Sequence, residues 1–211
     1  MEKRVRMIAV VFAVALLAAC APTQPPMPPG PSAQDHFNWG LNAFRMGQFD
    51  NAISEFQQAL AMDPGFADAY FYLGQTYEKK NMTADAERAY MDAIRANARH
   101  LKSREALGIL LYKSGRAGAA KEQLEQARAL FSIMPEVYFY LGEIYRAENR
   151  CLDALAAYER ALQLNSSYVE ARNALDVTKK TCRQPGTAGQ APVKVEKSFT
   201  GGGKAIDPGK F

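Results

Sequence analysis

The cysteines and histidines are the residues of this chain best suited to act as nucleophiles, general bases or metal ligands. They are Cys20, Cys151, Cys182, His36 and His100. None falls in a pattern that catalysis needs, because the sequence contains no Gly-rich phosphate loop, no nucleophile elbow and no His-Glu-x-x-His segment. Cys151 and Cys182 have no histidine near them in the sequence, which leaves too few ligands for a metal site. We therefore expect a protein that is not an enzyme and that carries no metal and no cofactor.

The first twenty residues have the pattern of a secretory signal that ends in a cysteine. Three basic residues precede an apolar run of eleven, residues 7–17, which is too short to span a membrane. The following Leu17-Ala18-Ala19-Cys20 resembles the lipobox of bacterial lipoproteins, which implies cleavage after residues 1–19 and attachment of acyl chains such as palmitate to Cys20. The alternative is an ordinary signal peptide or an uncleaved anchor in which Cys20 is incidental.

Lipidation would attach the mature protein to a membrane. One acyl chain binds a bilayer only marginally, whereas the three chains that the lipoprotein resemblance implies would hold the protein almost permanently. Residue 21 is Ala, and not the Asp that retains proteobacterial lipoproteins in the inner membrane. The resemblance therefore implies a bacterial cell-envelope location, as an outer-membrane lipoprotein that faces the periplasm.

Proline dominates the segment after Cys20. Residues 21–32 contain six prolines in twelve positions, a composition typical of a polyproline II spacer with a rise of about 3.1 Å per residue. We interpret residues 20–32 as a lipidated cysteine and a tether that holds the rest of the chain roughly 35–40 Å from the bilayer. Recognition of these prolines by a partner domain is the alternative.

A constant sequence period organises the chain from residue 33 to residue 168. Glycine recurs without a slip at Gly40, Gly74, Gly108 and Gly142. Alanine fills two more columns, at Ala52, Ala86, Ala120 and Ala154 and at Ala59, Ala93, Ala127 and Ala161. Large residues fill two others, at Trp39, Leu73, Leu107 and Leu141 and at Phe56, Tyr90, Leu124 and Tyr158. In both its interval and its residue types, this cassette resembles the tetratricopeptide repeat in four consecutive copies.

The resemblance implies an all-α fold, a right-handed superhelix of four helix-turn-helix repeats with a capping helix. The repeats would be residues 33–66, 67–100, 101–134 and 135–168. Each would contain two helices of about 13 residues, whose small residues let the backbones approach closely. Residues 169–182 keep the pattern at Leu175 but have Asp176 in place of the glycine, as expected for a cap that completes a domain of residues 33–182.

Few large apolar residues occur in residues 183–211, so we expect this tail to be disordered. Binding of the tail to another surface through Val193–Phe199 is the alternative. The net charge is small throughout the chain: 26 basic and 22 acidic residues become 23 and 21 once residues 1–19 are removed. This balance gives no support for a nucleic-acid partner.

The repeat resemblance also bears on the two later cysteines. Cys151 would begin the second helix of the fourth repeat, and Cys182 would end the capping helix, which runs antiparallel to it. If Cys20 is lipidated, an even pair remains in an oxidising compartment. We expect a Cys151–Cys182 disulfide that stabilises the end of the stack, with two free thiols as the alternative.

In this family, the first helix of each repeat lines a concave face that binds partners. Here the inner positions combine three phenylalanines and other apolar residues with flanking cations. The predicted groove consists of Phe37, Leu41, Phe44, Arg45, Phe71, Lys79, Ile109, Tyr112, Lys113 and Phe139. An exposed patch of this kind suits an amphipathic helix or an extended segment with apolar anchors. Packing of the aromatics against neighbouring helices, or against the proline-rich spacer, is the alternative.

The sequence therefore favours a lipid-anchored periplasmic scaffold or adaptor that binds a protein partner in the groove. Small lipoproteins with tandem tetratricopeptide repeats include the type IV pilus pilotins, and the resemblance to them implies a role in pilus or secretin assembly. A regulator of cell-wall enzymes or proteases, and a structural subunit of an outer-membrane assembly machine, are the alternatives. The identity of the partner and the oligomeric state stay open.

Overall fold

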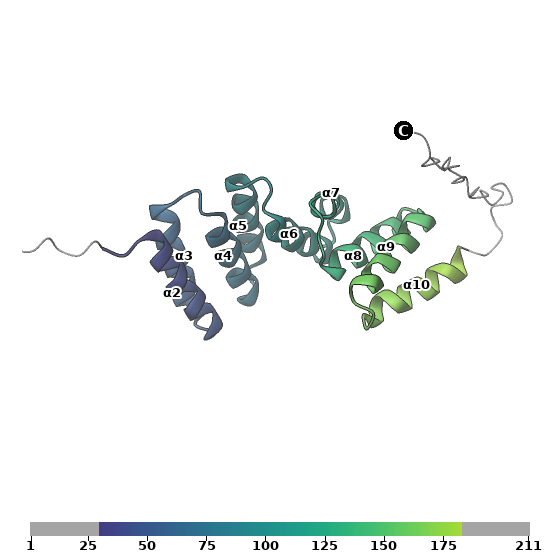
Figure 1. Ribbon diagram of the computed structural model, residues 1–211, viewed down its shortest axis with the longest axis horizontal. Coiled ribbons are helices and arrows are strands. Elements are labelled where there is room, and N and C mark those ends of the chain that lie inside the picture. Colours follow the sequence, from purple (N-terminus) through teal and green to yellow (C-terminus); the bar gives the residue numbers. More distant parts are fainter. Residues whose placement is uncertain (1–29, 183–211) are drawn as a thin grey trace, which may run out of the picture.

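The computed structural model describes residues 30–182, which form nine α-helices and no strand. The helices are α2 (Ala33–Arg45), α3 (Phe49–Met62), α4 (Ala67–Lys79), α5 (Thr83–Ala96), α6 (Leu101–Lys113), α7 (Ala117–Ala129), α8 (Pro135–Ala147), α9 (Cys151–Leu164) and α10 (Val169–Thr181). They stack side by side from α2 at one end to α10 at the other (Figure 1). The predicted all-α fold is confirmed. The predicted signal peptide, Cys20, most of the tether and the tail lie outside the described residues.

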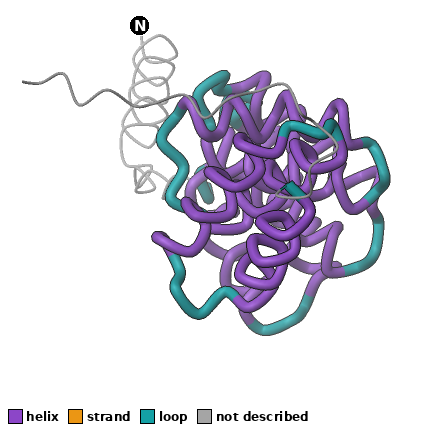
Figure 2. Tube along the Cα trace, turned by 90° about the vertical axis from the view of Figure 1, so that its right-hand side faces the viewer, coloured by secondary structure: helices purple, strands orange, loops and turns teal. Residues whose placement is uncertain are grey.

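The helices pack as four hairpins followed by one helix. Within each hairpin α2 contacts α3, α4 contacts α5, α6 contacts α7 and α8 contacts α9, while α10 packs on α9. First helices also contact one another along the stack, α6 with α8 and α8 with α10. Seen along the stack, the helices wind around a common axis with the loops at the periphery (Figure 2). No helix in this part of the chain combines the length and the apolar character that membrane crossing requires.

The repeating glycine has a steric role. A Cβ built on Gly40, Gly74, Gly108 or Gly142 would lie 2.5–2.6 Å from the large side chain sixteen residues later in the same repeat. Those side chains are Phe56, Tyr90, Leu124 and Tyr158, and all four are fully buried. Both alanine columns are fully buried as well, because they lie where two helix backbones approach most closely.

Left-handed backbone closes the turn inside each repeat. Gly47, Asn81, Gly115 and Asn149 have φ between 58° and 76° and occupy the same position in successive repeats. Glycine and asparagine tolerate this conformation better than other residues. Each of these four residues therefore ends a first helix and reverses the chain into the second.

The turns between repeats follow a second rule with one exception. Asp63, Asn97 and Asn165 each follow a second helix, and their side-chain Oδ1 accepts a hydrogen bond from the backbone N–H two residues later, at 2.9–3.0 Å. In the third repeat Phe131 occupies this position, with φ 62° and 87% of its surface exposed. Asp63, Asn97 and Asn165 have extended backbone, with φ between −142° and −133°. An aromatic side chain cannot accept that hydrogen bond, and α7 ends one residue earlier than its counterparts.

Trp39 differs from the other residues of its column. Leu73, Leu107 and Leu141 are buried against the preceding hairpin, whereas Trp39 is 50% exposed. No helix precedes α2 among residues 30–182, so the described part of the chain offers Trp39 no such surface. Its ring contacts His36 edge-on, with the ring centroids 5.0 Å apart.

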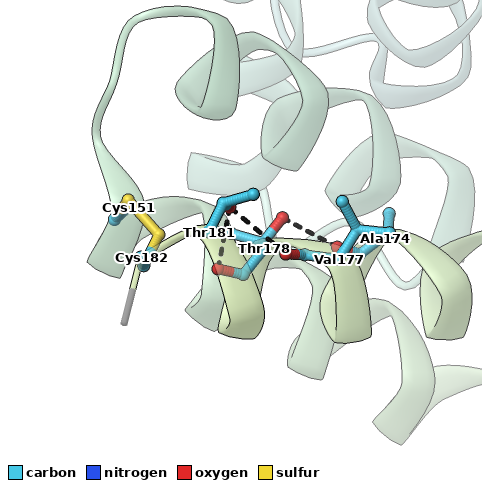
Figure 3. The surroundings of a disulfide bond; sticks show 6 residues. All are labelled: Cys151, Ala174, Val177, Thr178, Thr181 and Cys182. Atoms are coloured by element: carbon cyan, nitrogen blue, oxygen red, sulfur yellow. Dashed lines mark hydrogen bonds between the residues drawn. A yellow bond between two sulfur atoms is a disulfide. The ribbon is translucent and has the colours of Figure 1, made fainter. Parts of the chain in front are cut away.

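A disulfide joins Cys151, the first residue of α9, to Cys182 at the end of α10 (Figure 3). The two residues are 31 positions apart in the sequence. Near Cys182, Thr178 donates a hydrogen bond from its hydroxyl to the carbonyl oxygen of Ala174. The disulfide therefore fastens the last helix, α10, to the hairpin on which it packs.

Candidate functional site

The first helices of the second and third repeats enclose a cavity of about 560 Å³. We call it the groove cavity. Its lining residues are Phe71, Tyr72, Gln75, Glu78, Lys102, Glu105, Ala106, Ile109, Lys113 and Met134. Three residues of the predicted groove, Phe71, Ile109 and Lys113, come together here. The wall combines apolar side chains with two carboxylates and two ammonium groups.

Phe37 and Phe71 are core residues, with only 8% and 7% of their surfaces exposed. Each phenylalanine of this column packs between the buried aromatic residue of its own second helix and an aromatic residue in the turn that follows. The ring-centroid distances are 5.9 and 4.6 Å from Phe37 to Phe56 and Phe66, 5.9 and 5.8 Å from Phe71 to Tyr90 and His100, and 6.2 and 5.2 Å from Phe139 to Tyr158 and Tyr168. The expectation that Phe37 and Phe71 form an exposed patch is therefore corrected, because the third ring of each set covers them.

The remaining predicted groove residues are spread along the stack. Leu41 and Phe44 are half-buried beside the core of the first hairpin, and Arg45 and Lys79 are exposed. Tyr112 lies one repeat further along, with its ring centroid 4.8 Å from that of Tyr140. Burial raises the pKa of the Tyr112 phenol, as does the neighbouring Glu143. These residues line the same side of the stack but do not share one cavity.

Glu105 breaks the aromatic column in the third repeat. Its side chain is 5% exposed, and its Oε1 accepts a hydrogen bond of 2.5 Å from the hydroxyl of Ser132. Burial raises the pKa of the Glu105 carboxyl. The like charge of Glu136 also raises it, while the Ser132 hydrogen bond and Lys102 act in the opposite direction.

Ser132 fixes the turn that carries Phe131. Its hydroxyl oxygen accepts from the backbone N–H of Met134 at 3.2 Å, and its carbonyl oxygen accepts from the Tyr138 hydroxyl at 2.8 Å. With the bond to Glu105 and a backbone bond from its own N–H to the carbonyl oxygen of Ala127, four hydrogen bonds hold a residue that is 1% exposed. Phe131 and Ile133 flank it with 87% and 77% of their surfaces exposed.

Several of these features escaped the sequence analysis. The repeat period is unbroken through the third repeat, so the loss of the asparagine-type turn at Phe131 is visible only when that column is compared with Asp63, Asn97 and Asn165. Lys102 lies in the first turn of α6 and Met134 immediately precedes α8. At such helix ends the sequence pattern does not indicate which cavity a side chain lines. The sequence signal for this site is Glu105, which stands where the first helices of the other repeats have phenylalanine.

The histidines are engaged in local contacts. His36 Nδ1 lies 2.7 Å from Glu55 Oε2, and His100 Nδ1 lies 2.8 Å from the Ser103 hydroxyl. Among residues 30–182, no group of three or more His, Cys, Asp or Glu side chains is arranged to hold a metal ion.

A second cavity, of about 510 Å³, opens between α5, α6 and α7. Met91, Ile94 and Leu111 contribute apolar surface to it. At its rim the Arg116 guanidinium donates two hydrogen bonds to the Glu87 carboxylate, at 2.8 and 2.5 Å. This pairing lowers the pKa of Glu87. The charges of Glu87 and Arg116 therefore neutralise each other.

Comparison with known proteins identifies the repeat. Residues 37–100 and 105–175 match the family model described as tetratricopeptide repeat. Human tetratricopeptide repeat protein 7B is 28% identical over 152 residues, which cover 72% of this chain and 18% of that protein. Anaphase-promoting complex subunit 3 of Schizosaccharomyces pombe is 27% identical over 128 residues, which cover 59% of this chain and 19% of that protein. The chain thus spans less than a fifth of these relatives.

Solved structures share the fold at low sequence identity. A crystal structure of MamA has a TM-score of 0.63 and 22% identity, with 70% of this chain and 81% of that chain covered. YrrB, described as a tetratricopeptide repeat protein with an unusual peptide-binding site, has a TM-score of 0.64 and 23% identity, with 72% and 80% covered.

Proposed function

The chain belongs to the tetratricopeptide repeat family, and from this premise we propose that it is a lipid-anchored, non-enzymatic scaffold that holds a protein partner at the bacterial outer membrane. The observation that carries the proposal is the groove cavity, which lies between first helices of adjacent repeats. Stacked helical hairpins form extended binding surfaces of this kind. The peptide-binding site in the description of YrrB supports the same use of the fold.

The composition of the cavity wall indicates the kind of partner. Ile109 and Ala106 offer apolar contact, while Lys113 and Lys102 offer charged donors. A segment with apolar anchors and polar groups between them would match both. Phe71, which is almost fully buried, forms part of the same wall.

The membrane anchor in this proposal rests on the lipobox-like Leu17–Cys20 and on the prolines that follow it. Growth with labelled palmitate tests it directly. We expect the parent chain to incorporate label and Cys20→Ser to incorporate none. Equal labelling of the two proteins would remove the anchor from the proposal.

Capture from detergent-solubilised envelope tests the scaffold function. The chain serves as bait, together with Ile109→Gln and Lys113→Glu, which alter the groove cavity without replacing a core aromatic. Met91→Gln is the matched control, because Met91 lines the second cavity and is 47% exposed. We expect the groove variants to lose about tenfold or more of a specific partner and the control to retain it.

The identity of the captured protein decides the pathway. A secretin would support the role in type IV pilus assembly that the resemblance to pilotins implies. A wall-degrading enzyme, a protease or a barrel-assembly protein would replace that role. Retention of every partner by the groove variants would exclude the groove cavity as the binding site.

A further inference from the structure

The third repeat is the place where the phenylalanine column of the first helices is interrupted. In the other three repeats a phenylalanine of the first helix packs against two further rings. The equivalent positions here are Glu105, Leu124 and Met134, of which Glu105 and Met134 line the groove cavity. A carboxylate thus replaces an aromatic ring in the wall of a cavity. Sites where a sequence departs from its own repeating rule are where function is expected.

One oxygen of this carboxylate is open to the cavity. Within residues 30–182, Ser132 is the group that donates a hydrogen bond to the Glu105 side chain, and it does so at Oε1. No buried side-chain nitrogen or oxygen in that part of the chain lacks a hydrogen-bond partner. The Oε2 atom therefore retains contact with open space, and the groove cavity is the space that Glu105 lines. A buried carboxylate with a free oxygen favours a cationic donor.

The nearest ammonium group does not fill this role. Lys102 has its Nζ over the ring of Phe71, 5.9 Å from the ring centroid, and no hydrogen bond joins it to Glu105 in the described structure. Leu124 and Met134 offer only apolar contact. The cavity thus has the features of a subsite for a lysine side chain flanked by apolar residues.

We propose that the C-terminal segment Val193–Phe199 of the same chain occupies the groove cavity, with the Lys197 ammonium on Oε2 of Glu105. The sequence of this segment is Val-Lys-Val-Glu-Lys-Ser-Phe. In an extended segment alternate side chains share a face, which places Val195, Lys197 and Phe199 together. The apolar pair then contacts the wall on either side of the ammonium group. This inference rests on the proposed function only in assigning ligand binding to the groove cavity.

The connection is long enough for this contact. Fifteen residue steps separate Cys182 from Lys197, and a chain of that length reaches about 50 Å. From α10 to α6 there are two helix-to-helix contacts, through α8, each of about 10 Å. A return along one helix of about 13 residues adds about 20 Å.

Tethering also explains why this segment is the occupant and not a free peptide of the same kind. A short linker gives an effective concentration of about a millimolar. A contact with a dissociation constant below about a millimolar is therefore formed most of the time within one chain. A partner that uses the groove cavity would have to displace the segment.

Site-specific photocross-linking in the full chain, purified in detergent, tests the proposal. Phe199 is replaced by p-benzoylphenylalanine, and cross-linked peptides are mapped by mass spectrometry. We expect adducts within single chains on Met134 and Ile109. Lys197→Gln should lower the initial rate of cross-linking about tenfold, as expected for a charge-assisted hydrogen bond. Lys194→Gln is the matched control, since it removes the same charge from the opposite face.

Two further results decide the role of Glu105. Glu105→Gln should reduce cross-linking as much as Lys197→Gln, and the double variant should show no additional loss. Since Lys197 is not one of residues 30–182, which form the helical stack, its substitution tests the contact even if Glu105→Gln perturbs the fold. Equal effects of the two lysine substitutions, adducts elsewhere on the stack, or adducts only between two chains would overturn the proposal. No partner is present in this experiment, so its outcome is independent of the capture experiment.

Discussion

The Tyr158 ring fills the space that a side chain at Gly142 would need in the fourth repeat, because a Cβ built on Gly142 would lie 2.5 Å from Cε1 of that ring. The ring is fully buried, and its hydroxyl donates a hydrogen bond of 2.6 Å to Glu143. It therefore has little freedom to move aside. We expect Gly142→Ala to lower the free energy of unfolding by about 1–3 kcal/mol, as measured by urea denaturation.

Gly118 provides the control for this prediction. It is a helical glycine of α7, and a Cβ added there would meet no atom within 4 Å. Gly118→Ala should therefore raise the free energy of unfolding by up to about 1 kcal/mol through helix propensity alone. If the two substitutions had the same effect, close packing would not be the reason for the glycine column.

The Cys151–Cys182 disulfide is expected to stabilise the end of the stack. In the chain-entropy description, a cross-link that closes 31 residues contributes about 3–4 kcal/mol. We expect the Cys151→Ser/Cys182→Ser double variant to lose about this amount. Hydrogen exchange should accelerate first in α10, which has one hairpin on one side and no further helix among residues 30–182 on the other.

Cys20→Ser is the control, because it replaces the remaining cysteine of the chain and leaves the disulfide in place. Its free energy of unfolding should match that of the parent. Unchanged exchange in α10 of the double variant would show that packing on α9 suffices to hold this helix.

Phe131 is held in a conformation that its side chain disfavours, with φ 62°. Asn97, its counterpart in the second repeat, accepts a hydrogen bond at Oδ1 from the N–H of Arg99 at 3.0 Å. We expect Phe131→Asn to stabilise the protein by about 1 kcal/mol, because asparagine tolerates positive φ better than an aromatic residue does. Thermal and urea denaturation measure the change.

The reverse substitution, Asn97→Phe, is the companion experiment and should destabilise by a similar amount. If Phe131→Asn lowered the stability, the exposed phenylalanine would have to make a contact that compensates for its backbone.

The repeat period predicted much of the architecture because the residues that recur with it are those that close helix packing requires. The first helices begin at Ala33, Ala67, Leu101 and Pro135, one at the start of each predicted repeat, and the glycine and alanine columns lie at the closest helix contacts. The burial of individual side chains was harder to predict from the sequence. The position of Phe37 in its helix indicates the inner face, but its burial depends on Phe66, a turn residue whose ring covers it at 4.6 Å.

The groove cavity was predictable only in part for the same reason. Ile109 and Lys113 follow from the repeat pattern. Met134 and Ser132 belong to a turn whose length fits the period but whose conformation does not. Its shape is determined by two hydrogen bonds, one that Ser132 donates to Glu105 and one that it accepts from Tyr138. Such contacts between a turn and two helices do not recur with the repeat period, so the sequence pattern does not reveal them.

Glu105 should make the stability of the fold depend on pH. Its pKa is raised mainly by burial, and Glu136 contributes in the same direction, whereas Ser132 and Lys102 lower it. The folded state thus binds the proton more tightly than the unfolded state. The contribution of Glu105 to the free energy of unfolding must then fall as the pH rises from the ordinary glutamate pKa through the raised one, and stay level above it.

Glu105→Gln removes this dependence, because the glutamine oxygen can still accept the hydrogen bond from Ser132 but carries no charge. In the Lys197→Gln background, where no tail ammonium contributes, we expect the variant and its parent to have similar stability at acidic pH. The advantage of the variant should grow as the pH rises through the raised pKa. Urea denaturation at a series of pH values measures the difference, with Glu122→Gln as a control on an exposed glutamate. If the difference in free energy of unfolding between Glu105→Gln and its parent became smaller with rising pH, the protein would already stabilise the ionised Glu105 carboxylate. The subsite would then need no external cation.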